Sequence, residues 1–184
     1  MVGDDSYTYE NFYPYFKKSQ NFTMPDMSRR IANSTPLYDD CVLGTSGPLS
    51  VIFPNYAGAF GTWVRKGLAA VGINSIHGFQ SGRLIGSSYS LTTINYDTNF
   101  RDSSETAFLQ PAIQEANPNL ILFPLTMAKR IIFDSSNTAI GVQVDSQGLK
   151  YTLNAAKEVI VSAGAFQSPH LLMVSGVGPS ALLQ

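Results

Sequence analysis

The stretch that most constrains the fold of this chain is residues 157–178, which have the pattern of a strand, a tight turn and a short helix. Val159–Val161 is a continuous apolar, β-branched run, which is typical of a strand buried on both faces. The residues that follow it have small side chains, so backbone or a ligand can approach closely there. They are Ser162, Ala163 and Gly164.

The helix after this turn has recognisable start and stop residues. Ser168 is predicted to cap its N-terminus, with Pro169 in the first helical position, where an N–H would be unpaired anyway. Gly176 is predicted to take the left-handed conformation that ends a helix. By itself this pattern predicts a β-turn-α unit of an α/β protein.

The composition is that of a globular protein. The 184 residues are 44% apolar and 14% charged, which is enough for one domain with a sizeable core. A net charge of −1 and the lack of a basic run give no indication of a nucleic-acid partner or an acidic membrane surface. No apolar run reaches the roughly 18 residues of a membrane span. The first residues resemble neither a signal nor a transit peptide, and a secreted and a cytoplasmic location both stay open.

Two further motifs bear on the compartment and on metal binding. Cys41 is the only cysteine, so an internal disulfide and the usual Cys/His zinc site are excluded, and we expect no metal site. Asn21 and Asn33 each begin an N-glycosylation sequon, which has meaning only if the protein is secreted.

The first third of the chain is predicted to contain one aromatic helix, one loop and one strand. Aromatic residues recur at three- and four-residue spacing within residues 7–22, which predicts a short helix, interrupted by Pro14, whose aromatic face packs on a core. Residues 23–44 have the proline and small polar residues of a loop. Residues 44–53 are predicted to be a turn that leads into a strand.

Two more helices are predicted before residue 115. Residues 57–71 have apolar residues at the 3.6-residue period and a stop at Gly72, with Arg65 and Lys66 off the apolar face and expected in solvent. Asp102 and Glu105 have the spacing of a capping box at the start of the next helix. Pro111 is predicted to bend or end that helix.

From residue 119 onward the pattern changes to β-structure. Residues 120–123 are a second apolar run of the buried-strand type. Strands are predicted at 127–133, at 140–144 with one face in water, and at 150–153, with turns between them. This gives a three-stranded antiparallel meander between two buried strands.

The string EVIVSAGAFQSPHLLMVSGVGP at residues 158–179 resembles, without a gap, the second signature of the glucose–methanol–choline (GMC) family of flavin-dependent oxidoreductases. The aromatic "PYFKKS" helix, the "GPL" turn, the helix start at Arg101 and the strands after residue 119 are also similar to segments of that family. The resemblance is loose up to about residue 115 and close after it. It implies that the chain is an interior piece of a longer protein.

The resemblance implies a mixed α/β fold in two parts. Residues 1–115 would be part of the substrate-binding domain, with connecting helices. Residues 116–184 would be the second half of a Rossmann-like FAD-binding domain that carries the antiparallel meander. The cofactor would be FAD, with the backbone at Ala128 beside the adenine. The turn formed by Ser162, Ala163 and Gly164 would line the nucleotide side of the pocket.

The chain lacks other parts that such an enzyme needs. It has no GxGxxG phosphate turn, and no residue matches the catalytic histidine pair of the family. His77 and His170 are expected to be surface or packing residues, so no catalytic residue is assigned.

Three possible functions of the parent protein stay open. The resemblance implies hydride transfer from a primary or aromatic alcohol, a small-molecule substrate, to FAD. The first alternative is a GMC-fold cyclase of aromatic metabolite biosynthesis that catalyses no net redox reaction. The second is an inactive, truncated relic. The sequence does not indicate the oligomeric state, and by itself the fragment is expected to be inactive.

Overall fold

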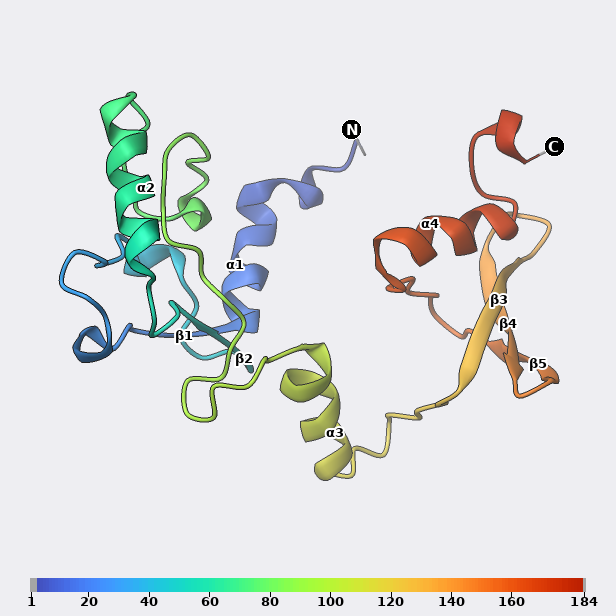
Figure 1. Cartoon of the computed structure of the whole chain (residues 1–184). Coiled ribbons are helices and arrows are strands. Elements are labelled where there is room, and N and C mark those ends of the chain that lie inside the picture. Colours follow the sequence, from blue (N-terminus) through green and yellow to red (C-terminus); the bar gives the residue numbers. More distant parts are fainter. Residues whose placement is uncertain (1–2, 184) are drawn as a thin grey trace. The chain divides into compact units, whose positions relative to one another are not determined.

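The computed structural model describes residues 3–183, which form two compact units that divide between Leu120 and Ile121 (Figure 1). The helices are α1 (Tyr9–Ser19), α2 (Ala59–Ala70), α3 (Gln110–Gln114) and α4 (Gly164–Val174); the strands are β1 (Gln20–Thr23), β2 (Leu49–Ile52), β3 (Thr126–Phe133), β4 (Ala139–Ser146) and β5 (Leu149–Asn154). A π-helical turn at Glu105–Leu109 leads into α3. Single 3₁₀ turns lie at Asp5–Tyr7, Met27–Arg29, Asp40–Val42, Phe79–Ser81 and Ser180–Leu182. The mixed α/β prediction is confirmed.

The first unit is built on the short parallel pair β1 and β2, in which Gln20 lies opposite Leu49. Its core consists of Phe22, Leu43 and Phe53, each less than 10% exposed. The rings of Phe22 and Phe53 meet edge to face, with centroids 6.0 Å apart. This geometry is favourable for aromatic pairs and comes with a large buried apolar area.

The predicted turn before β2 is confirmed, and Gly44 explains why it is tight. A Cβ atom at Gly44 would lie 1.8 Å from the carbonyl oxygen of Lys17, at the end of α1. Only glycine allows the two backbones to approach so closely. The turn thereby sets the pairing of β2 with β1.

The helix α1 is present but differs from the prediction in two ways. It runs through Pro14 without interruption, because proline has a helical φ and removes only the hydrogen bond to the carbonyl of Glu10. Its aromatic side chains do not pack on the core: Tyr15 is 67% and Phe16 50% exposed. Spacing predicts which residues share a face, but it does not show what covers that face.

The helix α2 matches its predicted range and ends at Gly72, whose φ is +89°. Lys66 is exposed, as expected. The expectation for Arg65 was wrong, because its guanidinium donates to the carbonyls of Asn33 (2.8 Å) and Thr35 (3.1 Å). The apolar periodicity of α2 does not show that the loop with Asn33 and Thr35 lies beside Arg65.

The predicted capping box at Asp102 and Glu105 was also wrong. Ser103 and Thr106 make the reciprocal bonds: the Ser103 N–H donates to Thr106 Oγ1 (2.8 Å) and the Thr106 N–H to Ser103 Oγ (3.4 Å). Pro111 does not end the helix, which continues to Gln114 after the π-helical turn.

Asp102 connects this helix start to β2. Its carboxylate is 8% exposed and accepts the N–H groups of Ser50 (2.8 Å) and Ser103 (3.1 Å) and the hydroxyl of Thr106. Burial of the carboxylate by itself raises the pKa of Asp102, but the hydrogen bonds outweigh that effect and lower the pKa overall. The charged carboxylate is therefore the form that stabilises the fold.

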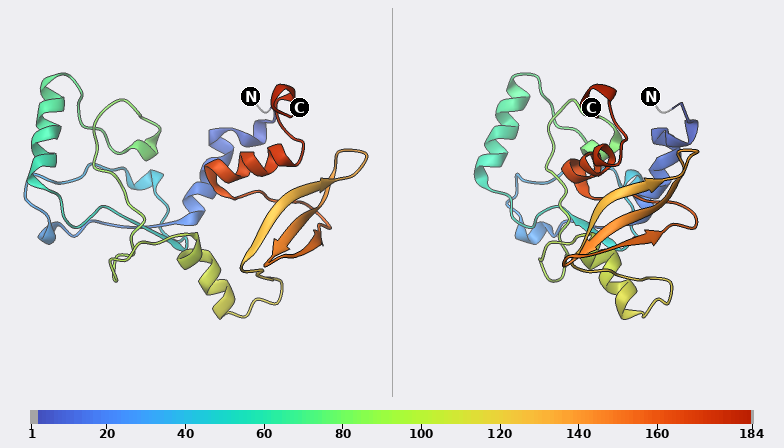
Figure 2. Two further views of the ribbon diagram at one scale, coloured as in Figure 1. Left: turned by 45° about the vertical axis from the view of Figure 1, so that its right-hand side comes forward. Right: turned by 90° about the vertical axis from the view of Figure 1, so that its right-hand side faces the viewer.

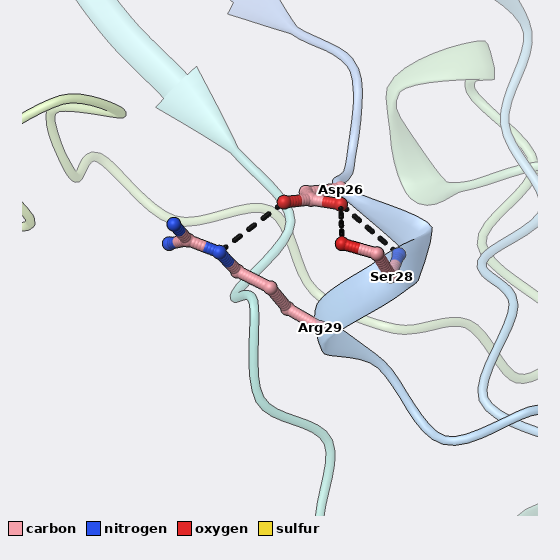
Figure 3. Close-up of polar contacts among 3 residues, drawn as sticks. All are labelled: Asp26, Ser28 and Arg29. Carbon is pink, nitrogen blue, oxygen red and sulfur yellow. Dashed lines mark hydrogen bonds and ion pairs between the residues drawn. The ribbon is translucent and has the colours of Figure 1, made fainter.

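Asp26 caps the 3₁₀ turn at Met27–Arg29 (Figure 3). It accepts hydrogen bonds from the hydroxyl (2.6 Å) and N–H (3.0 Å) of Ser28, which lower its pKa, and pairs with Arg29 Nε at 3.2 Å. Within residues 3–183 this is the only ion pair, and the Arg29 side chain is 61% exposed. Exposed ion pairs contribute little stability, so the main effect of Asp26 is to fix the conformation of this turn.

The second unit contains the predicted antiparallel meander, in the order β3-β4-β5. Both views in Figure 2 show α4 running beside it. The two are connected by Ser175, whose hydroxyl accepts the N–H of Ile131 in β3 (2.8 Å) and donates to the Leu171 carbonyl in α4 (2.6 Å). One side chain thus holds the C-terminal end of α4 against the sheet.

The two predicted buried strands that flank the meander, residues 120–123 and 159–161, are not strands in the structure. Ile121 is 73% and Ile160 76% exposed. An apolar run forms a strand only when another backbone pairs with it, and among residues 3–183 no segment pairs with either run.

The helix α4 begins at Gly164 and not, as predicted, after a cap at Ser168. Pro169 therefore lies inside the helix. The predicted end at Gly176 is confirmed: its φ is +87°, its N–H donates to Met173 (3.0 Å) and the next N–H, of Val177, to Leu172 (2.9 Å). This is the Schellman arrangement, which satisfies two terminal carbonyls.

Replacing Gly176 with valine is expected to destabilise the second unit by at least about 1–2 kcal/mol, because a β-branched residue resists positive φ. A Cβ atom there would meet nothing within 4 Å, so the cost is conformational and not steric. Gly176→Asn is the matched control and should cost less, because asparagine tolerates this conformation. Equal melting temperatures for all three proteins would contradict the assigned helix end.

Replacing Asp102 with asparagine is expected to cost about 1–3 kcal/mol at neutral pH. The pKa of Asp102 is lowered from 3.8 in the fold, so the stabilisation is complete above about pH 3.8 and is lost as the pH falls through the folded-state value. Urea denaturation at several pH values should show the difference between the two proteins shrinking in acid. Asp97→Asn, at an exposed carboxylate, is the control and should show no such difference.

Candidate functional site

Ala128 lies on the exposed part of β3, next to an irregularity in the sheet. Ala128 pairs with Val144 and Arg130 with Gln143, so Lys129 is an extra residue that forms a β-bulge. Among the described residues β3 pairs with β4 alone. The outer edge of β3 thus has no strand partner there, although farther along the strand the N–H of Ile131 donates to Ser175.

The turn formed by Ser162, Ala163 and Gly164 lies immediately before α4 and is exposed. Gly164 has a φ of +90°, and a Cβ atom there would meet nothing within 4 Å. The hydroxyl of Ser168 accepts the N–H of Ala163 (2.9 Å). Ser168 therefore holds the turn from within the helix, five residues after Ala163, whereas the sequence predicted that it would begin the helix.

The sequence-predicted site residues all fall in the second unit, where α4 packs on β3. Ala128 and the turn at Ser162–Gly164 offer main-chain groups, one hydroxyl and small apolar surfaces. None of them titrates near neutral pH, so they can bind and exclude water but cannot move a proton.

The two histidines lie elsewhere on the chain and both are exposed. His170 Nδ1 lies 3.4 Å from the side-chain oxygen of Gln167, and His77 belongs to the first unit. Over residues 3–183, no three metal-binding side chains of His, Cys, Asp or Glu gather in one place. No helix in this range is long and apolar enough to span a membrane.

One face of α1 lines a cavity of about 530 Å³ in the first unit. The spacing of these aromatic residues favoured a helix that packs on a core over a binding cage. Tyr9 and Tyr13 pack with ring centroids 5.3 Å apart, and the Tyr9 hydroxyl donates to the Gln80 carbonyl (3.3 Å). Burial first, and the nearby Tyr9 second, raise the pKa of Tyr13. The other lining residues are Phe16, Lys17, Gln20, Val42, Phe79, Gly82 and Leu84.

The sequence profile of the GMC oxidoreductases matches residues 2–182. The chain therefore belongs to the GMC oxidoreductase family, as the string at residues 158–179 indicated.

Among curated relatives, the chain is similar to a patulin synthase from Aspergillus clavatus, with 53% identity over the whole chain and 29% of the relative's length. It is also 43% identical over its whole length to a versicolorin B synthase from Aspergillus parasiticus, of which it covers 28%. The chain thus spans somewhat less than a third of the length of these relatives.

Solved structures share the fold. An FAD-dependent oxidoreductase from Chaetomium thermophilum superposes with a TM-score of 0.82 at 25% identity, over 98% of this chain and 31% of that one. A fungal aryl-alcohol oxidase superposes with a TM-score of 0.82 at 23% identity, over 96% of this chain and 29% of that one.

The cofactor that the family and the solved relatives indicate is FAD. The residues of the second unit are compatible with the adenine end of FAD, because β3 pairs on one edge only and Ala128 has a small, exposed side chain. The turn at Ser162–Gly164 has no side chain large enough to block it. These residues do not supply a glycine-rich phosphate turn, so they fit one part of the cofactor and not its pyrophosphate.

The hydrogen bond from the Ala163 N–H to Ser168 is expected to hold this turn. Replacing Ser168 with alanine should lower the free energy of unfolding by about 1 kcal/mol, as for the loss of a helix cap. Ser162→Ala, which removes an exposed hydroxyl, is the control and should leave the melting curve unchanged. If both variants melt like the parent, Ser168 does not hold the turn.

Proposed function

We propose that the protein to which this chain belongs is an FAD-dependent oxidoreductase that oxidises a primary or aromatic alcohol. The observation that carries the proposal is the family match over residues 2–182, together with 53% identity to a patulin synthase. The likeness to an aryl-alcohol oxidase supports the fold on which such a reaction takes place. When bound, FAD supplies an acceptor for the hydride of the alcohol carbon.

In this proposal the two units have different tasks. Residues 1–115 form part of the substrate-binding domain, and residues 116–184 form part of the FAD-binding domain. The main chain at Ala128 holds the adenine, and the turn at Ser162–Gly164 forms the wall on the nucleotide side. The chain contributes binding and orientation, and the groups that move the alcohol proton come from outside it.

A second candidate is a cyclase that uses the same fold without net oxidation. The observation that favours it is the 43% identity to a versicolorin B synthase over the whole chain. The third candidate is an inactive, truncated relic of such an enzyme.

Anaerobic mixing of the complete protein with benzyl alcohol separates these candidates. Oxidation of the alcohol should bleach the flavin absorbance within one turnover, and admission of oxygen should restore it. A yellow protein that is not bleached by benzyl alcohol or by related primary alcohols would contradict the alcohol oxidase proposal and favour the cyclase. A colourless protein that takes up no FAD would favour the relic.

By themselves, residues 1–184 are expected neither to retain FAD nor to oxidise alcohols. Contacts at the adenine alone must offset an association cost of about 4–15 kcal/mol without a pyrophosphate site. Flavin fluorescence during titration with FAD measures this directly. Stoichiometric binding, or oxygen consumption by the chain alone, would show that the cofactor site is misplaced.

A further inference from the structure

Two arginines in the first unit pack on one tyrosine. The guanidinium carbons of Arg30 and Arg65 lie 5.0 and 5.3 Å from the ring centroid of Tyr89. Arg30 is only 7% exposed, and burial lowers its pKa. Within residues 3–183 neither arginine has a carboxylate within 4.0 Å, and both donate only to main-chain carbonyls.

Two buried hydroxyls without partners lie in the segment that carries this ring. The hydroxyls of Tyr89 and Ser87 are buried and make no hydrogen bond within residues 3–183, and both residues line one cavity. Ser87 is more than nine-tenths buried.

This combination is unusual in a folded unit. Buried polar atoms in native proteins nearly always have partners, and a bound ligand is one way in which such atoms are satisfied. Buried positive charge likewise favours a nearby anion, since it has lost much of its hydration. The cluster of Arg30, Arg65, Ser87 and Tyr89 therefore combines positive charge with two unpartnered hydroxyls, which favours an anionic ligand.

A cavity adjoins the cluster. It measures about 260 Å³ and is lined by Arg65, by residues 87–90 and by one face of α2. Besides Arg65, the α2 residues that line the cavity carry no polar side chain: Gly61, Val64 and Leu68. The cavity is somewhat smaller than the usual range for drug-sized ligands, about 300–1,000 Å³.

We propose that this cavity binds the carboxylate of a small organic acid with an apolar body about the size of benzoate. The carboxylate accepts hydrogen bonds from Arg65 and from the hydroxyl of Ser87, and the apolar body lies against Val64 and Leu68. Arg65 suits this role, because its bonds to Asn33 and Thr35 use two of the five N–H groups of a guanidinium and leave others for a carboxylate. The site goes beyond the proposed oxidation and does not depend on a redox reaction.

Calorimetric titration of the complete, oxidised protein with sodium benzoate at constant ionic strength tests the site. Benzoate should bind with one-to-one stoichiometry and benzamide, its neutral analogue, at least about tenfold more weakly. Arg65→Met should weaken benzoate binding by about tenfold or more. Lys66→Met is the matched control, since it removes the same charge from the next residue of α2, which lies outside the cavity. It should leave the affinity unchanged.

Ser87→Ala keeps the test valid if Arg65→Met fails to fold. It removes a hydroxyl that has no partner, so its melting temperature should not fall, while benzoate binding should weaken several-fold. No benzoate binding to the parent would overturn the proposal. Binding that is insensitive to both Arg65→Met and Ser87→Ala would also overturn it, since benzoate would then bind elsewhere.

Discussion

The second unit depends on the main-chain hydrogen bonds that pair β3 with β4 and β4 with β5. Each of these strands finds its partner across a short turn, so the meander forms from local sequence alone. The hydroxyl of Ser175 then attaches α4 to β3 through the N–H of Ile131. The proposed cofactor contacts depend on this ladder, because it leaves β3 without a second strand partner at Ala128 and places the turn at Gly164 at the start of an attached helix.

The same constraint separates what the sequence could predict from what it could not. Strands with a neighbour close in the chain were predicted well, as were the ends of α2 and α4 at Gly72 and Gly176, where one residue sets the backbone conformation. The apolar runs at 120–123 and 159–161 have the composition of strands but no pairing backbone among the described residues. Composition alone cannot show whether a partner is present.

Side-chain contacts between residues far apart in the sequence were also not predicted. Arg65 reaches a loop thirty residues earlier in the chain, and Asp102 bonds to β2 across fifty-two residues. No local pattern signals such contacts. The candidate cofactor residues Ala128 and Ser162–Gly164 came from the resemblance to the family and not from spacing, since small residues that would bind through main chain leave no side-chain pattern. No sequence pattern predicted the cluster around Tyr89. Only the three-dimensional structure shows that its hydroxyls lack hydrogen-bond partners.

The central claim is that this chain supplies the adenine side of a GMC flavin site through the open edge of β3 and the turn before α4. Hydrogen exchange of the complete protein, with and without FAD, tests it most directly, because exchange reports on main-chain N–H groups. FAD should slow exchange at residues 126–130 and 162–166 and leave β5, the far edge of the same sheet, unchanged. Equal protection of β5, or none at residues 126–130, would contradict the claim.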